Sequence, residues 1–426
     1  MIEPRRSGVC AAAGLTVFAL AGCATSSSDS FQRIEAVQAQ AEIPEDELLD
    51  VGIVVLDDGV SEEWDQAELN ERGVYPDIRK SETRYFAVLL KRTLEATGQW
   101  GAVRVVPKGA EGLDVMVSGE ILESNGKDLE LQIRAVDSRG REWFDEKQKA
   151  EADTLAYLVT QERQTSKRGR SATQTHGKEL DPYQGLYNQI ANQLFAVREH
   201  LDSDDLKQIR YTSQLRFAAD LAPSAFGSHV RADEKGRFEV ERLPAVDDPL
   251  LARIARIKAR DDLFVDTLND HYANFFSKMD PAYDQWRWYS YEEELALEDL
   301  ERQKRNRTIL GIASTITAVV GTVKDNRTIR DVGVIGAVTA FSSASGKGAE
   351  IEMSKAAIEE LASSFEADVE PALIDVEGRT LRLTGTAQAQ YQTWRKLLRE
   401  LFESETALPV DPNTGMTVTA DDPQGR

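Results

Sequence analysis

The sequence predicts an α+β protein with three parts: a small N-terminal α/β domain, a helical middle region with a Gly-rich hairpin, and a C-terminal αββα module. Three patterns lead to this prediction. Between residues 43 and 153, short β-branched or alternating runs are separated by turn residues. Between residues 183 and 307, apolar residues recur at helical spacing. Residues 350–405 read as helix, strand, strand and helix.

The composition fits a chain with hydrophobic cores. The 426 residues are enough for two or three domains, and the hydrophobic fraction of 41% supports buried interiors. The charged fraction of 29% argues against a bundle of membrane helices. The formal net charge of −22 argues against a broad binding surface for nucleic acid or for anionic lipid, because both need a positive footprint.

The first 23 residues have the order of an export signal. Arg5 and Arg6 precede an apolar run from Val9 to Leu20, and the small residues Ala21 and Gly22 follow it. The run is shorter than the ~20 apolar residues that a spanning helix needs. Residues 1–22 are therefore predicted to be a signal peptide.

The end of this signal, Leu20-Ala21-Gly22-Cys23, resembles the lipobox of bacterial lipoproteins. The resemblance implies cleavage before Cys23 and acylation of its thiol and new amino group, so Cys23 is the predicted lipid attachment site. An ordinary signal peptide followed by a chance cysteine is the alternative. By the same resemblance, Ala24 rather than Asp implies the outer membrane, with the protein facing the periplasm.

The mature chain would hold no free thiol, because Cys10 lies within the signal and Cys23 would carry lipid. A fold without disulfides is therefore expected. Residues 23–42 contain a Ser-rich run and a Gln/Ala-rich stretch with little to bury, and they are predicted to be a flexible tether. The four histidines are scattered, so no metal site or other cofactor is predicted.

The α/β domain is predicted over residues 43–153. A strand at Ile53–Leu56 precedes a helix at Ser81–Thr97, and the remaining predicted strands are Val103–Val106, Leu113–Val117, Leu129–Asp137 and one that carries Trp143. This order resembles the small α/β domain of the TolB N-terminal domain, of curli-secretion lipoproteins and of lipoprotein activators of peptidoglycan synthases. The resemblance covers about a quarter of the chain and implies a fold, not an activity.

Residues 154–182 are predicted to be a basic linker loop, which is either solvated or a patch that binds an anionic partner.

Residues 183–307 are predicted to be helical, with separate helices at Pro249–Phe276 and Glu292–Arg307. Between these two helices lies a cluster of aromatic residues: Tyr283, Trp286, Trp288, Tyr289 and Tyr291. The cluster is either a core where helices meet or a platform for sugar rings.

Residues 308–349 are predicted to be a Gly/Ala-rich helical hairpin. Its first apolar run, Thr308–Val323, would reach only ~24 Å as a helix, so a hairpin buried in protein is favoured over one that inserts into a membrane. Residues 350–405 faintly resemble the BON module of envelope proteins through Val376–Gly385. Residues 406–426 are predicted to be a disordered tail.

No motif for catalysis stands out in this sequence, and no catalytic residue is predicted. The favoured interpretation is a non-enzymatic scaffold or assembly factor that binds an envelope protein. One alternative is a hydrolase acting on peptidoglycan or polysaccharide, with two carboxyl groups and the aromatic cluster as its sugar platform. Another is an oligomeric component of an export system. The sequence leaves the partner and the oligomeric state open.

The predicted anchor can be tested by fractionation. Cys23→Ala should release the protein from membranes, because each buried methylene of an acyl chain contributes about 0.8 kcal/mol to anchoring. Ser26→Ala is the matched control and should stay with the membranes. Unchanged membrane fractionation of the Cys23 variant would contradict lipid attachment.

Overall fold

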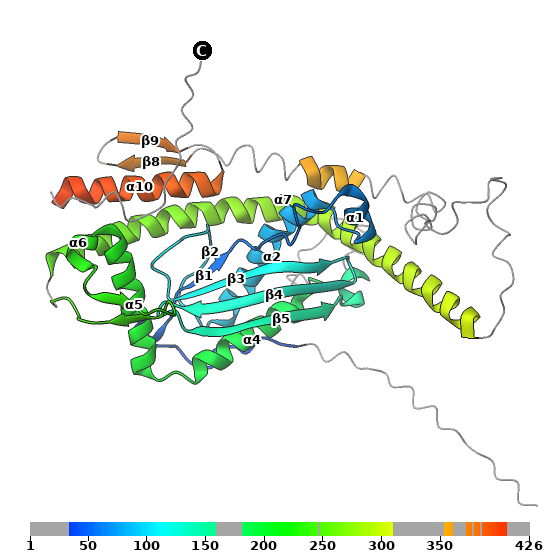
Figure 1. The fold of residues 1–426 in the computed structure, drawn as a ribbon, viewed down its shortest axis with the longest axis horizontal. Coiled ribbons are helices and arrows are strands. Elements are labelled where there is room, and N and C mark those ends of the chain that lie inside the picture. Colours follow the sequence, from blue (N-terminus) through cyan, green and yellow to red (C-terminus); the bar gives the residue numbers. More distant parts are fainter. Residues whose placement is uncertain are drawn as a thin grey trace, which may run out of the picture. The chain divides into compact units, whose positions relative to one another are not determined.

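The computed structural model describes residues 34–158, 181–245, 248–309, 353–360, 372–376, 379–383 and 386–406 (Figure 1). It confirms the α+β class: these residues hold a five-stranded mixed sheet, several long helices and a small two-stranded hairpin near the C-terminus. Cys23, the basic segment 159–180, the hairpin segment 310–349 and the tail after residue 406 lie outside the described residues.

The main sheet has the strand order β2-β1-β3-β4-β5. Its strands are β1 (Val51–Val54), β2 (Val103–Val106), β3 (Val115–Ser124), β4 (Asp128–Asp137) and β5 (Glu142–Glu151). β1 pairs in parallel with both β2 and β3, whereas β3, β4 and β5 pair antiparallel. A central parallel strand is buried on both faces, which explains the short, continuous apolar run that the sequence shows there.

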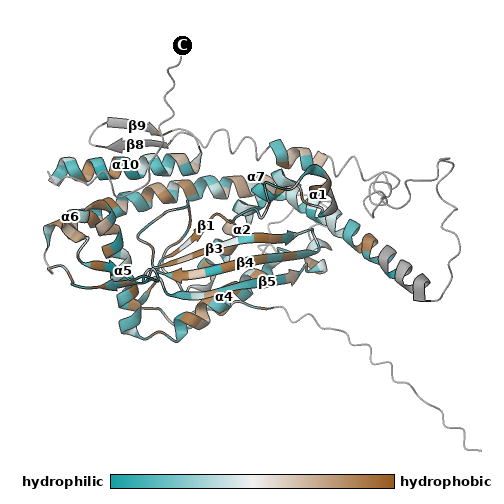
Figure 2. Ribbon diagram, viewed as in Figure 1, coloured by the Kyte–Doolittle hydropathy of each residue, from teal (hydrophilic) through white to brown (hydrophobic). Residues whose placement is uncertain are grey.

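The antiparallel strands bury only one face. In β4, Leu129, Leu131 and Ile133 are buried, and the polar residues between them point the other way. The alternation of brown and teal along β3 and β4 in Figure 2 shows this pattern. On the polar face, ion pairs cross between strands, with Lys147 Nζ 3.3 Å from Glu130 Oε1. Such a sheet has one face on the core and one in solvent.

The helices before residue 249 surround one end and one face of the sheet. They are η1 (Glu45–Glu47), α1 (Gln66–Glu71), α2 (Pro76–Thr97), α4 (Gln184–Glu199), α5 (Ser203–Leu221) and α6 (Pro223–Phe226). Residues 154–158 are helical as well, so the predicted linker loop is wrong at its start. α2 confirms the predicted helix and ends at Gly98, whose φ of 65° suits glycine. Asp202 caps α5 by accepting a hydrogen bond from the Asp205 N–H. A short hairpin of β6 (Val230–Ala232) and β7 (Phe238–Val240) follows α6.

A single helix, α7 (Pro249–Ile309), replaces the two separate helices that the sequence predicts. Pro281 lies inside α7, where proline removes one backbone hydrogen bond. Met279 and Tyr283 on either side of it are fully buried, so both halves of the helix are held against the core. Packing therefore outweighs the local preference of proline to end a helix.

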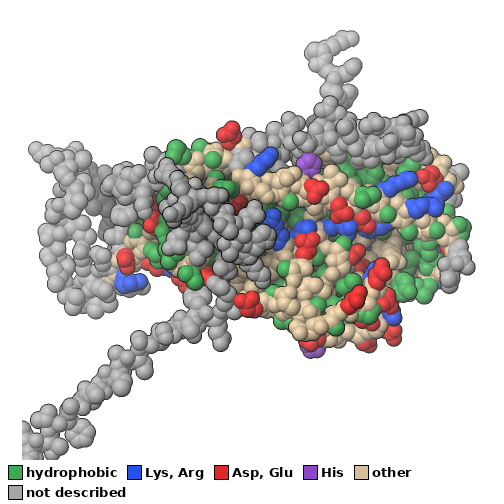
Figure 3. Space-filling model, turned by 180° about the vertical axis from the view of Figure 1, so that it is seen from behind, with side chains coloured by type: hydrophobic (Ala, Val, Ile, Leu, Met, Phe, Trp, Pro, Cys, Tyr) green, Lys and Arg blue, Asp and Glu red, His purple; other side chains and the backbone are tan. Residues whose placement is uncertain are grey.

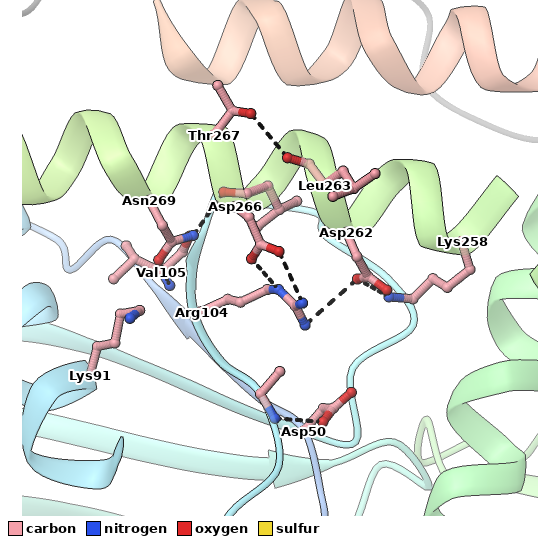
Figure 4. A network of polar contacts seen from close by, with 12 residues as sticks. Asp50, Lys91, Arg104, Val105, Lys258, Asp262, Leu263, Asp266, Thr267 and Asn269 are labelled. Carbon is pink, nitrogen blue, oxygen red and sulfur yellow. Dashed lines mark hydrogen bonds and ion pairs between the residues drawn. The ribbon is translucent and has the colours of Figure 1, made fainter. Parts of the chain in front are cut away.

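α7 closes the β2 edge of the sheet (Figure 4). The Asn269 side chain accepts a hydrogen bond from the Val105 N–H at 2.8 Å and donates one to the Val105 carbonyl at 3.0 Å. This amide thus occupies the place of a neighbouring strand. Beside it, Arg104 Nε lies 2.7 Å from Asp266 Oδ1, and Arg104 Nη1 lies 3.7 Å from Asp262. The β2 edge cannot accept another strand while α7 stays in place.

The C-terminal elements pack on α7 at two places. Strands β8 (Ala372–Val376) and β9 (Arg379–Leu383) confirm the predicted pair, and the predicted closing helix is α10 (Ala387–Thr406). Trp394 of α10 lies 5.3 Å from Phe264 between ring centroids. Helix 353–360 instead meets α7 where the Ser354 hydroxyl lies 3.2 Å from Gln285 Oε1. Phe264 and Gln285 stand about 30 Å apart along α7, so the two helices of the predicted αββα module use distant parts of it.

The role of Asn269 can be tested by unfolding. Asn269→Ala would leave both backbone groups of the buried Val105 without partners, so it should lower the free energy of unfolding by about 1–3 kcal/mol. Thr267→Ala is the control, since this exposed hydroxyl bonds only within its own helix, to the Leu263 carbonyl. Urea denaturation measures both variants. An Asn269 variant as stable as the control would show that the amide does not hold the edge.

Candidate functional site

The aromatic cluster on α7 is part of the core. Tyr283, Trp286 and Tyr291 are buried, and the rings of Tyr283 and Trp286 stack with centroids 5.7 Å apart. Tyr283 also meets Tyr85 of α2 edge-on at 4.7 Å. The interpretation of this cluster as a core is therefore confirmed. Because these ring faces contact protein, they cannot form the sugar platform that the hydrolase alternative requires.

A buried guanidinium lies within this cluster. Arg287 is 1% exposed and pairs with Asp181 at 2.8 Å and with Asp284 one turn before it. Its guanidinium carbon lies 4.6 Å from the Tyr283 ring centroid. Asp181 lies three residues before α4, so this ion pair joins the start of α4 to α7. The buried guanidinium therefore has two carboxylate partners, as a buried cation needs.

Glu82 is the second buried charge centre. Its carboxyl accepts hydrogen bonds from the hydroxyls of Ser124 at 2.7 Å and Tyr283 at 2.6 Å, and it lies 3.6 Å from Arg79 Nε. Burial raises the pKa of Glu82, although the neighbouring Arg79 acts in the opposite direction. The group joins α2, β3 and α7, and its partners Ser124, Tyr283 and Arg79 all lie in the interior. Its perturbed pKa therefore reflects a structural role rather than a site open to substrate.

A third buried carboxyl, Asp114, joins the start of β3 to β1 and α5. It accepts a hydrogen bond from the Asp50 N–H at 2.8 Å and another from the Ser213 hydroxyl. Burial raises its pKa to about 6. The Ser213 hydroxyl also lies 2.9 Å from the Arg210 carbonyl, so it can reorient if the carboxyl is replaced.

One surface pocket has a volume of about 440 Å³ and lies between η1 and α5. Its lining residues are Glu45, Asp46, Lys207, Arg210, Tyr211 and Gln214. The hydrogen bond from Lys207 lowers the pKa of Asp46, whose carboxylate oxygen lies 3.1 Å from Lys207 Nζ. Asp46 is thus held ionised and is unsuited to protonating a leaving group, which needs a raised pKa.

The feature best suited to binding a partner is the outer edge of β5, called here the β5 edge. β5 pairs with β4 alone, and within the described part of the chain no other backbone group bonds to Glu142–Glu151. An unpaired edge of ten residues presents a row of backbone donors and acceptors. The sequence predicts this strand through Trp143, but it does not show which of the two sheet edges stays open.

Charged side chains accompany the β5 edge. Lys149 Nζ lies 3.3 Å from Glu123 and 3.4 Å from Asp128, and Lys147 pairs with Glu130. Lysines on an edge strand discourage unspecific pairing, so a partner strand would need complementary charges. Beneath the strand, the Gln148 side chain bonds to Gln193 and Gln189 of α4, which holds β5 in register. Over the described surface as a whole, seen from behind in Figure 3, acidic and basic side chains are interspersed.

Comparisons of the chain with family models, with curated proteins and with solved structures found no match. In the part of the chain that the structure describes, no helix is both long and apolar enough to cross a membrane. The same residues contain no cluster of three or more His, Cys, Asp or Glu arranged to hold a metal ion. Cys23, the single site residue that the sequence predicts, lies outside them.

The raised pKa of Asp114 predicts a pH dependence of stability. Its folded-state pKa of about 6 exceeds the value of ~3.9 expected in the unfolded chain. Between these values the folded state holds a proton that the unfolded state has released. The contribution of Asp114 is therefore full below about pH 4 and is lost as the pH rises through 6, a difference of about 2–3 kcal/mol.

Asp114→Asn should remove this dependence, because the amide oxygen can accept from the Asp50 N–H while the amide NH2 donates to the Ser213 hydroxyl, which then donates to the Arg210 carbonyl alone. Between pH 4 and pH 7 the wild type should lose about 2–3 kcal/mol of stability relative to the variant. Urea unfolding at both pH values measures this, with Asp270→Asn on the exposed side of α7 as control. An equal stability difference at the two pH values would contradict the assignment.

Proposed function

We propose that the protein is a lipid-anchored lipoprotein of the outer membrane that faces the periplasm and binds an envelope protein as a non-enzymatic scaffold. The lipobox at Cys23 and the neutral Ala24 support the location. A lipid anchor combined with a folded domain suits a protein that holds others at a membrane surface.

The β5 edge is the observation that carries the binding role. The other edge of the sheet is closed by Asn269 and Arg104, so a partner strand can add only beside β5. An added strand would gain main-chain hydrogen bonds from the edge and specificity from Lys147 and its neighbours. The partner is therefore expected to contribute an extended segment with acidic residues at alternate positions, opposite the lysines.

A hydrolase has weaker support. Its proposed aromatic platform is buried, and the pocket beside α5 contains an acid with a lowered pKa. Release of sugar or peptide fragments from peptidoglycan by the purified full chain would nevertheless overturn the non-enzymatic assignment.

Site-specific photo-crosslinking in cells tests the binding role. A crosslinking side chain in place of Lys147, on β5, should capture one defined envelope protein. The matched control is position 120 on β3, which shares the open face of the sheet but lies two strands inside the edge. Capture at both positions would indicate binding to the face of the sheet, and capture at neither would contradict partner binding here.

A further inference from the structure

The segment of residues 34–42, called here the N-terminal strap, is bound to the fold, although the sequence assigns it to a flexible tether. The Val37 N–H donates to Asn192 Oδ1 at 2.8 Å, and the Asn192 amide donates back to the Glu35 carbonyl at 2.9 Å. Asn188 donates to the Ile34 carbonyl at 2.7 Å. Figure 1 shows the strap, in dark blue, running beside α4.

The strap limits how far the fold can stand from a lipid on Cys23. Ile34, the first residue held to α4, follows Cys23 by eleven positions. A chain advances at most ~3.6 Å per residue, so Ile34 can lie no more than about 40 Å from the anchored residue. By contrast, α7 alone is about 90 Å long. A lipid on Cys23 therefore keeps the side of the fold that carries Ile34 near the membrane, and it cannot bring all other sides equally close.

The helix α4, to which the strap is bound, is unusually free of charge for this chain. Residues 184–197 of α4 contain no acidic or basic side chain, although the net charge of the protein is −22. On the strap itself, Ile34 is 40% exposed and Val37 is 43% exposed. Glu35 and Glu42 of the strap are also exposed, so the uncharged stretch is confined to α4. There no carboxylate repels anionic headgroups, and the exposed Ile34 and Val37 can settle among the headgroups.

We propose that the face formed by the N-terminal strap and α4 lies against the phospholipid surface. This orientation rests on the proposed lipid anchor at Cys23. Three observations on one side of the molecule support it: the attachment point of the chain, the absence of charge on residues 184–197, and the exposed Ile34 and Val37. Since Gln148 of β5 contacts α4, the β5 edge then opens close to the bilayer, and the partner's segment must reach it there.

Two labelled variants of the full chain test this orientation. Apart from Cys23, the predicted mature chain has no cysteine, so Ala196→Cys and Leu263→Cys each supply one free thiol for a fluorophore. Ala196 is exposed on α4. Leu263 is 67% exposed on α7, which covers the opposite edge of the sheet. The lipidated proteins are placed on phosphatidylethanolamine–phosphatidylglycerol vesicles with a nitroxide quencher on the headgroups.

We expect fluorescence to be lost at position 196 and retained at position 263. Equal quenching at both positions, or stronger quenching at position 263, would overturn the orientation while leaving the anchor intact. The Cys23→Ala forms of both variants should neither sediment with the vesicles nor be quenched. If the lipidation-competent chain also failed to sediment with the vesicles, the anchor itself would be overturned, and the orientation with it.

Discussion

A guanidinium buried in the middle of α7 constrains much of this fold. Arg287 is almost completely removed from water, and an unpaired charge there would cost several kcal/mol. Its carboxylate partners are Asp284 on α7 itself and Asp181 at the start of the segment that becomes α4. The ion pair with Asp181 therefore ties α4 to α7. Tyr283, whose ring lies beneath the guanidinium, donates to Glu82 and so ties α7 to α2 and the sheet.

The position of α7 then makes the sheet asymmetric. With α7 held against α2, Asn269 reaches Val105 and closes the β2 edge. β5, at the far side of the sheet, has α4 beneath it and a row of paired charges on its other face. Lysines along an edge strand discourage aggregation through chance strand pairing, while the backbone groups of the edge stay accessible. This asymmetry directs any added strand to one side of the molecule, beside α4 and the N-terminal strap.

Much of the regular structure could be predicted because it depends on local patterns. The alternation from Leu129 to Arg134 identifies β4, and the helical spacing from Phe86 to Leu94 identifies α2. The β6–β7 hairpin was missed, although the turn ending at Gly236, with a φ of 75°, was a usable signal. The continuity of α7 was missed because Pro281 locally favours a break, and only the burial of its neighbours outweighs that preference.

The sequence by itself predicted an export signal that ends at Cys23, and it determined the α+β class and most element positions, because charge order and periodicity are properties of adjacent residues. Tertiary structure alone decided that the Trp286–Tyr291 cluster is core, that Asn269 seals one sheet edge and that the strap lies on α4. Each of these depends on contacts between residues far apart in the chain, such as Val105 with Asn269 and Ile34 with Asn188. Side-chain burial and edge coverage arise only when such distant elements meet, so no local pattern could reveal them.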